Sequence, residues 1–301
     1  MISIIITSFK EPKTIGKSIE SFTNQKIKEK YELIVAVPDK ETQNVVKKYC
    51  KKNNTLKGTS KIKLFKDPGK GKSYALNLLL PKLKGEIIIL SDGDVFVSEN
   101  SVNEILKKFK DLSVGCVSGR VVSDENRKKM FGYWSHLLCD AAHKLRKKRN
   151  NKNKFLECSG YLWGFRNKVI KKFPLDVGED TIVPIMFYLK NYEIKYAEKA
   201  EVYVKFPTKI NEFLKQKRRT AGAHDNISKY VNVKKIPRMK TFFNEVGGGV
   251  GVFFSAKSFK ELIWTFCLFP FRLYIWMNLF YNSYVRKRKY SDAWKRVESS
   301  K

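Results

Sequence analysis

The chain has 301 residues, of which 43% are hydrophobic and 13% aromatic, so it can bury a core and is not intrinsically disordered. The 61 lysine and arginine residues outnumber 29 acidic ones, and the net charge of +32 suits nucleic acid, anionic lipid headgroups or phosphorylated substrates as partners. The five cysteines are far apart and form no C-x-x-C pair, which argues against a disulfide framework and against a zinc site.

Strand-like and helix-like segments alternate through the first half of the chain. The strand-like runs are Ile2–Thr7, Tyr31–Val37, Lys61–Phe65 and Glu86–Leu90. Between them apolar residues recur at three- and four-residue steps, as at Ile15, Ile19 and Phe22. This rhythm predicts a βαβα order with parallel strands buried on both faces. The first strand begins at the second residue without a basic leader or a cleavage site, so we expect a cytoplasmic protein.

The loop DPGKGKSYALN, between the third and fourth strands, has the residues of a phosphate-binding loop. Lys70 or Lys72, together with backbone N–H groups at the start of a helix, would hold phosphates. The GKS tripeptide is similar to the end of a P-loop. A P-loop needs a glycine where this chain has Lys66, so a P-loop NTPase is excluded.

The stretch EIIILSDGDV places Asp92 and Asp94 directly after the fourth strand. Ser101 and Glu104 have the spacing of a capping box, so a helix should start just beyond these aspartates. Open α/β sheets bind ligands outside the carboxyl ends of their strands. Two carboxylates on a short loop repel each other unless a cation lies between them, which indicates a site for Mg²⁺ or Mn²⁺ bridging to phosphates. The alternative is an Asp-Gly turn that caps the next helix.

The second half of the chain has a mixed pattern up to about Tyr203 and then changes character. A strand-like VGCVSGRVV, a charged helical segment around Trp134–Arg149 and the segment SGYLWGFR come first. After Val231, a glycine-rich stretch leads into the apolar and aromatic segment Leu262–Val285, which holds the single charge Arg272.

The order of strand, SFKEP, strand, GKSYALN and D-x-D resembles that of the family 2 glycosyltransferases over roughly residues 1–225. The resemblance implies the GT-A fold, a Rossmann-like α/β domain for nucleotide-diphospho-sugars with a mixed, mostly parallel sheet and flanking helices. Residues 1–230 would form this catalytic domain, with a donor half, 1–110, and an acceptor half, 111–230. Residues 231–301 would form a C-terminal helical region.

The resemblance also implies roles for residues at the donor. The turn from Thr7 to Glu11 would cradle the base and ribose, Asp39 would lie beside uracil, and Asp92 and Asp94 match the metal-binding D-x-D motif. The full set implied to contact the nucleotide-sugar is Thr7, Ser8, Glu11, Asp39, Lys70, Lys72, Asp92, Gln216, Arg218 and Arg219.

The acceptor side of the resemblance lies in SGYLWGFRN and in VGEDTIVP. Gly160, Trp163 and Glu179 are implied to contact the acceptor. Asp180 would be the general base, which takes the proton from the acceptor hydroxyl while the metal steadies the leaving diphosphate. The alternative is that Glu179 and Asp180 only cap a helix.

The segment FLKQKRRTAGAH resembles the Q-x-x-R-W signature of membrane-associated polysaccharide synthases. Gln216 and Arg219 match the signature, and Thr220 replaces the tryptophan. Guanidinium groups bind a diphosphate through paired donors. His224 is a candidate third metal ligand, although a lone histidine is more often structural.

The segment Leu262–Val285 would be about 36 Å long as a helix, enough to cross a bilayer core of roughly 30 Å. Pro270 and Arg272 near its middle argue against a simple spanning helix. Its aromatic residues and the following RKRK sequence suit the anionic cytoplasmic face of the cell membrane, where we expect the tail to lie. A spanning helix and a buried core helix stay as alternatives.

The function expected from the sequence is inverting transfer of a sugar from a nucleotide-diphospho-sugar, with UDP favoured, to a hydroxyl of a lipid-linked or glycan acceptor. One alternative is a processive polysaccharide synthase or a subunit of one, and another is an inactive sugar-nucleotide-binding scaffold. The net charge leaves a nucleic-acid-binding protein as a third, but no recognition helix, zinc module or RNA-binding signature supports it.

Overall fold

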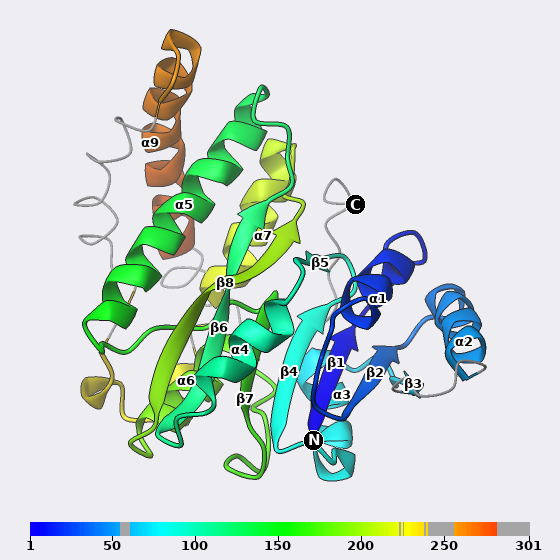
Figure 1. The fold of residues 1–301 in the computed structure, drawn as a ribbon. Coiled ribbons are helices and arrows are strands. Elements are labelled where there is room, and N and C mark those ends of the chain that lie inside the picture. The colour runs from blue at the N-terminus through cyan, green and yellow to red at the C-terminus, as the bar shows by residue number, and fades with distance from the viewer. Residues whose placement is uncertain (55–60, 223, 225, 238, 240–255, 282–301) are drawn as a thin grey trace.

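A mixed eight-stranded sheet forms the centre of the protein, with helices on both faces (Figure 1). The computed structural model describes residues 1–54, 61–222, 224, 226–237, 239 and 256–281. The strands are β1 (Ile2–Thr7), β2 (Tyr31–Val37), β3 (Ile62–Lys66), β4 (Ile87–Asp92), β5 (Phe96–Val97), β6 (Val114–Ser123), β7 (Leu162–Arg166) and β8 (Glu193–Val204). Their order in the sheet is β3-β2-β1-β4-β7-β6-β8-β5.

The helices follow the alternation that the sequence predicts in the first half. They are α1 (Ile15–Thr23), α2 (Lys40–Asn54), α3 (Lys72–Leu79), α4 (Ser101–Lys108), α5 (Met130–Asn151), α6 (Glu179–Tyr188), α7 (Ile210–Gly222) and α9 (Phe259–Phe280). The described residues also form three short 3-10 helices: η1 (Leu80–Lys82), η2 (Ile227–Lys229) and η3 (Val233–Lys235).

The four predicted strands, β1 to β4, are parallel to one another, as expected. β1 pairs with β2 and β4, and β2 pairs with β3. All six residues of β1 are buried, because Ile5 belongs to the core on one face of the sheet and Ile4 and Ile6 belong to the core on the other. Burying one such side chain contributes about 1.5–3 kcal/mol, so continuous apolar runs hold these strands in the middle of the fold.

β7 reverses direction and makes the sheet mixed. It is antiparallel to both β4 and β6, while β6 and β8 are parallel and β5 is antiparallel to β8. In the register of β4 and β7, Ser91 lies opposite Leu162. The start of β7 therefore lies at the same edge as the carboxyl ends of β1 and β4, and the residues just before Leu162 come next to Asp92.

The start of α4 at Ser101 agrees with the sequence, but the predicted capping box is wrong. The N-cap residue is Asn100, whose φ of 61° places it in the left-handed region that asparagine tolerates. The Ser101 hydroxyl donates instead to the backbone carbonyl of Glu201 in β8, at 3.0 Å. The serine thus ties α4 to the sheet and does not cap the helix.

Helix α9 lies along α5 and α7, at the end of the molecule remote from β3 (Figure 1). It begins at Phe259, three residues before the expected segment, because the Ser258 side chain accepts a hydrogen bond from the backbone N–H of Glu261. Residues 282–285 of that segment lie outside the described residues. Within the described chain, none of the helices combines the length and apolarity needed to span a bilayer.

Candidate active site

The candidate site lies at the edge where β1, β2 and β4 end. Thr7 is in register with Asp92, and its hydroxyl donates to Asp92 Oδ1 at 3.1 Å. The backbone N–H of Gly93 donates to the Thr7 carbonyl at 2.8 Å. These contacts fix the D-x-D turn against β1. Thr7, predicted to contact the donor, and Asp92, predicted to bind the metal, therefore lie side by side.

Gly93, between the two aspartates, allows a close approach of the backbone to the Ser8–Glu11 turn. A Cβ atom at Gly93 would lie 2.4 Å from Ser8 Oγ and 2.7 Å from Glu11 Oε2. The Ser8 hydroxyl donates to the same Glu11 oxygen at 2.7 Å. Any side chain at position 93 would push these two predicted donor-binding residues away from the aspartates.

Asp39, at the end of β2, holds the Thr7–Glu11 turn in place. Its carboxylate accepts from the backbone N–H of Lys10 at 2.7 Å and of Thr42 at 2.9 Å. Burial alone would raise the pKa of Asp39, but these N–H groups outweigh burial and lower the pKa below its ordinary value. Asp39 is therefore a carboxylate at neutral pH, and its contact with a nucleobase stays a prediction.

Lys72 is the lysine that reaches the acidic edge, the group of carboxylates formed by Asp92, Asp94 and Glu179 where the strands end. Its Nζ lies 2.7 Å from Asp92 Oδ1 and 2.8 Å from Glu179 Oε1, and its side chain is only 12% exposed. Burial would lower the pKa of Lys72, but the two carboxylates overcome this effect and raise the pKa well above its usual value. Lys70, in contrast, is exposed, and its ammonium lies over the Tyr74 ring at 5.3 Å.

Asp180 enters the site from the first turn of α6. Glu179 and Asp180 begin this helix, and Glu179 is buried against Lys72. A Cβ atom at Gly160, just before β7, would lie 2.9 Å from Asp180 Oδ2. The missing side chain at Gly160 thus leaves the space that the Asp180 carboxylate occupies.

Gly160→Ala is expected to slow the sugar transfer implied by the sequence resemblance by about tenfold to a hundredfold, because the new methyl group displaces the Asp180 carboxylate, and displacements near 1 Å can cost that much. Transfer rates of the two proteins check this expectation. Binding of the nucleoside diphosphate, which involves other residues, serves as the control and should not change. A variant with the wild-type rate would contradict the placement of Asp180.

Tyr161 connects α7 to the site, a role that the sequence does not suggest. The Tyr161 carbonyl accepts from the Ser91 hydroxyl at 2.8 Å, and the Tyr161 hydroxyl accepts from Gln216 Nε2 at 3.5 Å. Burial raises the pKa of Tyr161, and the charges of Asp94 and Asp92 raise it further against the opposing effect of Arg219. The tyrosine ring therefore lies within the field of the D-x-D carboxylates and of the arginine on α7.

Other predicted residues fall outside this group. The Trp163 side chain is fully buried and stacks on Phe165 with 5.2 Å between ring centroids, and its contact with an acceptor stays a prediction. The side chain of Arg218 lies outside the described part of the chain. Arg219 is exposed on α7, and His224 lies half-buried just beyond the end of this helix. The role of His224 as a metal ligand stays a prediction.

The acidic edge has the donor atoms that a magnesium or manganese ion prefers. Among the described residues, no group of three or more His, Cys, Asp or Glu side chains is arranged to hold a metal. Asp92 and Asp94 supply carboxylate oxygens, and the Lys72 ammonium shows that Asp92 accepts a positive charge. Mg²⁺ is commonly bound by one or two carboxylates together with phosphate oxygens, so these residues fit a metal that arrives with a diphosphate.

The fold and this acidic edge define a sugar transferase of the GT-A type. The model of glycosyl transferase family 2 matches residues 3–173, more than half of the chain, and the chain belongs to this family. The match includes Thr7, Asp39, Lys72 and the D-x-D aspartates but ends before Asp180. No curated protein matches the chain significantly.

Two solved structures are similar to this chain, and the fold is shared with the first of them. The mannosyltransferase PcManGT from Pyrobaculum calidifontis, in complex with GDP-Man and Mn2+, has a TM-score of 0.59 and 16% identity over 95% of this chain and 81% of its own. Residues 1–349 of S. aureus TarS, in complex with UDP-GlcNAc, have a TM-score of 0.48 and 18% identity over 73% of this chain and 65% of theirs. The predicted GT-A architecture is confirmed, whereas the Q-x-x-R-W similarity has no support in these comparisons.

Proposed function

We propose that this glycosyltransferase moves a sugar, with inversion at the anomeric carbon, from a nucleotide-diphospho-sugar to a hydroxyl of a lipid-linked or glycan acceptor. The observation that carries the proposal is the convergence of four charged groups from three separate segments. Asp92 from β4 and Lys72 from α3 form an ion pair, and α6 brings Glu179 to the same lysine and Asp180 to the adjoining Gly160.

In the proposed reaction, Asp180 accepts the proton of the acceptor hydroxyl. The acceptor oxygen forms a bond to the anomeric carbon as the bond from that carbon to the diphosphate oxygen breaks. Mg²⁺ or Mn²⁺ bound by Asp92 and Asp94 would supply Lewis-acid stabilisation of the leaving diphosphate. Lys72 adds a second positive charge at the same place, and its raised pKa keeps the ammonium charged throughout the neutral range.

Thr7, Ser8, Glu11 and Asp39 provide the surface proposed for the nucleoside. Thr7 is the last residue of β1, Ser8 and Glu11 lie on the turn that follows, and Asp39 follows β2. We favour UDP as the nucleotide because the resemblance places Asp39 beside uracil. PcManGT carries GDP-Man and TarS carries UDP-GlcNAc, so both nucleotides are tested.

A screen of UDP- and GDP-sugars with Mg²⁺ or Mn²⁺ tests this proposal through the release of nucleoside diphosphate. We expect release from a UDP-sugar and loss of release when a chelator removes the metal. Release from none of the sugars, with any tested acceptor, would contradict the proposal. The polysaccharide-synthase alternative depends on the segment around Gln216 and Thr220, and product length on a defined acceptor separates it from single transfer.

A further inference from the structure

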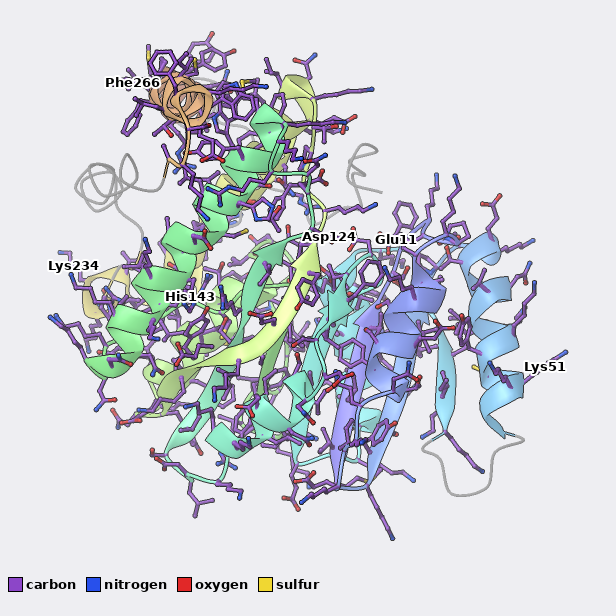
Figure 2. All side chains as sticks on the ribbon, turned by 45° about the horizontal axis from the view of Figure 1, so that its top comes forward. Glu11, Lys51, Asp124, His143, Lys234 and Phe266 are labelled. Carbon is purple, nitrogen blue, oxygen red and sulfur yellow. The ribbon has the colours of Figure 1, made fainter. Side chains whose placement is uncertain are left out.

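An apolar stripe covers the outward face of α9. At helical spacing it consists of Phe259, Ile263, Phe266, Cys267, Leu273, Tyr274, Met277 and Tyr281, all of them exposed. Phe259 is 78% exposed, Phe266 59% and Met277 63%. Figure 2 shows Phe266 on the side of α9 that faces away from α5. Large contiguous apolar surfaces are unusual on soluble proteins and mark contact sites.

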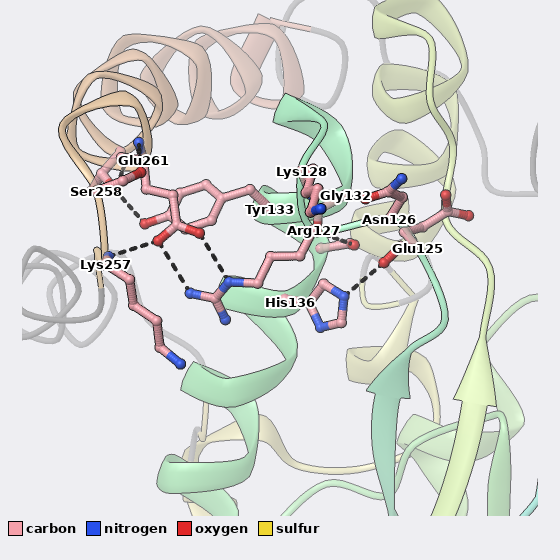
Figure 3. A network of polar contacts seen from close by, with 12 residues as sticks. Glu125, Asn126, Arg127, Lys128, Gly132, Tyr133, His136, Lys257, Ser258 and Glu261 are labelled. Carbon is pink, nitrogen blue, oxygen red and sulfur yellow. Dashed lines mark hydrogen bonds and ion pairs between the residues drawn. The ribbon is translucent and has the colours of Figure 1, made fainter.

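The opposite face of α9 is fixed to the domain by polar contacts (Figure 3). Arg127 pairs with Glu261 at 3.0 Å, and the Tyr133 hydroxyl lies 2.7 Å from the Thr265 hydroxyl. The indole N–H of Trp134 donates to a backbone carbonyl of α9 at 2.7 Å. Rotating the helix to bury the apolar stripe would break all three contacts, so these contacts hold the stripe on the outward face of α9.

We propose that this face docks on an anionic lipid surface, with α9 lying in the plane of the headgroups. Side chains such as Tyr274 and Tyr281, with an apolar ring and a polar hydroxyl, suit the boundary between headgroups and acyl chains.

The positive charge of the protein favours an anionic lipid surface, and not a second copy of the chain, as the partner that covers the apolar stripe. Lys257 and Lys260 flank the start of the stripe, and the sequence RKRK, residues 286–289, follows α9 in the chain. Two copies that each carry a net charge of +32 repel each other, whereas an anionic surface attracts them. The binding of an interfacial helix grows with its buried apolar area and with its electrostatic attraction to anionic lipid.

Flotation with lipid vesicles tests this docking. We expect the wild-type protein to float with vesicles that contain phosphatidylglycerol, to float less with pure phosphatidylcholine, and to be partly released by salt. The double variant Phe266→Glu/Met277→Glu should lower the bound fraction by about tenfold or more, since two apolar contacts become two repelled charges. The matched control is Leu112→Glu, at a 79% exposed position between α4 and β6, which should float like the wild type.

Two outcomes would overturn the inference. The first is that the wild-type protein does not float with phosphatidylglycerol vesicles. Dimers of the wild-type protein that the double variant abolishes, without binding to vesicles, would count as this outcome. The other is a double variant that floats as well as the wild type. Thermal unfolding confirms that the variants are folded, and Phe266→Ser replaces the double variant should it unfold. Flotation needs no sugar donor, so its failure is separate from a failure of the proposed transferase activity.

Discussion

Asp180→Asn is expected to lower the rate of sugar transfer by about 10²–10⁴-fold, the usual contribution of a general base. The amide keeps the shape of the carboxylate but does not accept a proton from the acceptor hydroxyl at neutral pH. Because Asp92, Lys72 and the turn after β1 are untouched, binding of the nucleoside diphosphate should stay within about twofold of the wild type. Transfer rates and diphosphate binding, measured on the same preparations, separate these two effects.

Asp176→Asn is the matched control for this experiment. Asp176 lies four residues earlier in the chain, and its carboxylate pairs with Lys229 at 2.8 Å near the surface. Removing a partly exposed ion pair of this kind costs about 0–1 kcal/mol, so transfer should stay near the wild-type rate. Equal transfer rates for the Asp180 and Asp176 variants would show that Asp180 is not the base.

Lys72→Met is expected to lower the free energy of unfolding by roughly 3 kcal/mol and to abolish most transfer activity. Without the ammonium, the carboxylates of Glu179, only 7% exposed, and of Asp92 lose the cation that lies between them. Urea unfolding at pH 7 measures this loss. Lys70→Met is the control on the same loop, and its exposed lysine should contribute little to stability.

The direction of the pKa shift of Lys72 determines how its contribution to stability changes with pH. The pKa of Lys72 is raised in the folded protein, so its stabilising contribution is fully present below the unfolded value of about 10.4 and is lost as the pH rises through the folded pKa. The difference in unfolding free energy between wild type and Lys72→Met should therefore be constant from about pH 7 to pH 10 and shrink above that range. A variant as stable as the wild type at pH 7 would show that the ion pairs have no net effect.

The positions of the residues at the carboxyl ends of β1, β2 and β4 could be predicted from the sequence for a simple physical reason. Parallel strands with continuous apolar runs place their carboxyl ends at one edge, and the family resemblance assigns Thr7, Asp39 and Asp92 to those ends, where the structure has them. The loop pattern alone left Lys70 and Lys72 as alternatives, because the choice depends on where α3 begins, although the family resemblance favours Lys72. Lys72 is the first residue of that helix and points to the acids, whereas Lys70 remains on the exposed loop.

The second half was harder to predict because its contacts are distant in the sequence. Tyr161 reaches Gln216 only because β7 runs antiparallel to β4, a pairing that local patterns do not encode. Trp163 was placed at the acceptor from its neighbours in sequence, but both faces of β7 are covered and the indole lies in the core. Ser101 has the spacing of a cap, yet the nearby strand β8 offers its hydroxyl a carbonyl.

Calorimetric titration of uridine diphosphate into the protein, with and without Mn²⁺, tests the central claim that Asp92 and Asp94 bind the donor's diphosphate through a metal ion. We predict that Mn²⁺ strengthens binding by about tenfold or more in the wild type, a difference near 1.4 kcal/mol, and that Asp94→Asn and Asp92→Asn remove this strengthening. Binding that is equally tight without the metal, or that keeps its metal dependence in both variants, would contradict the claim.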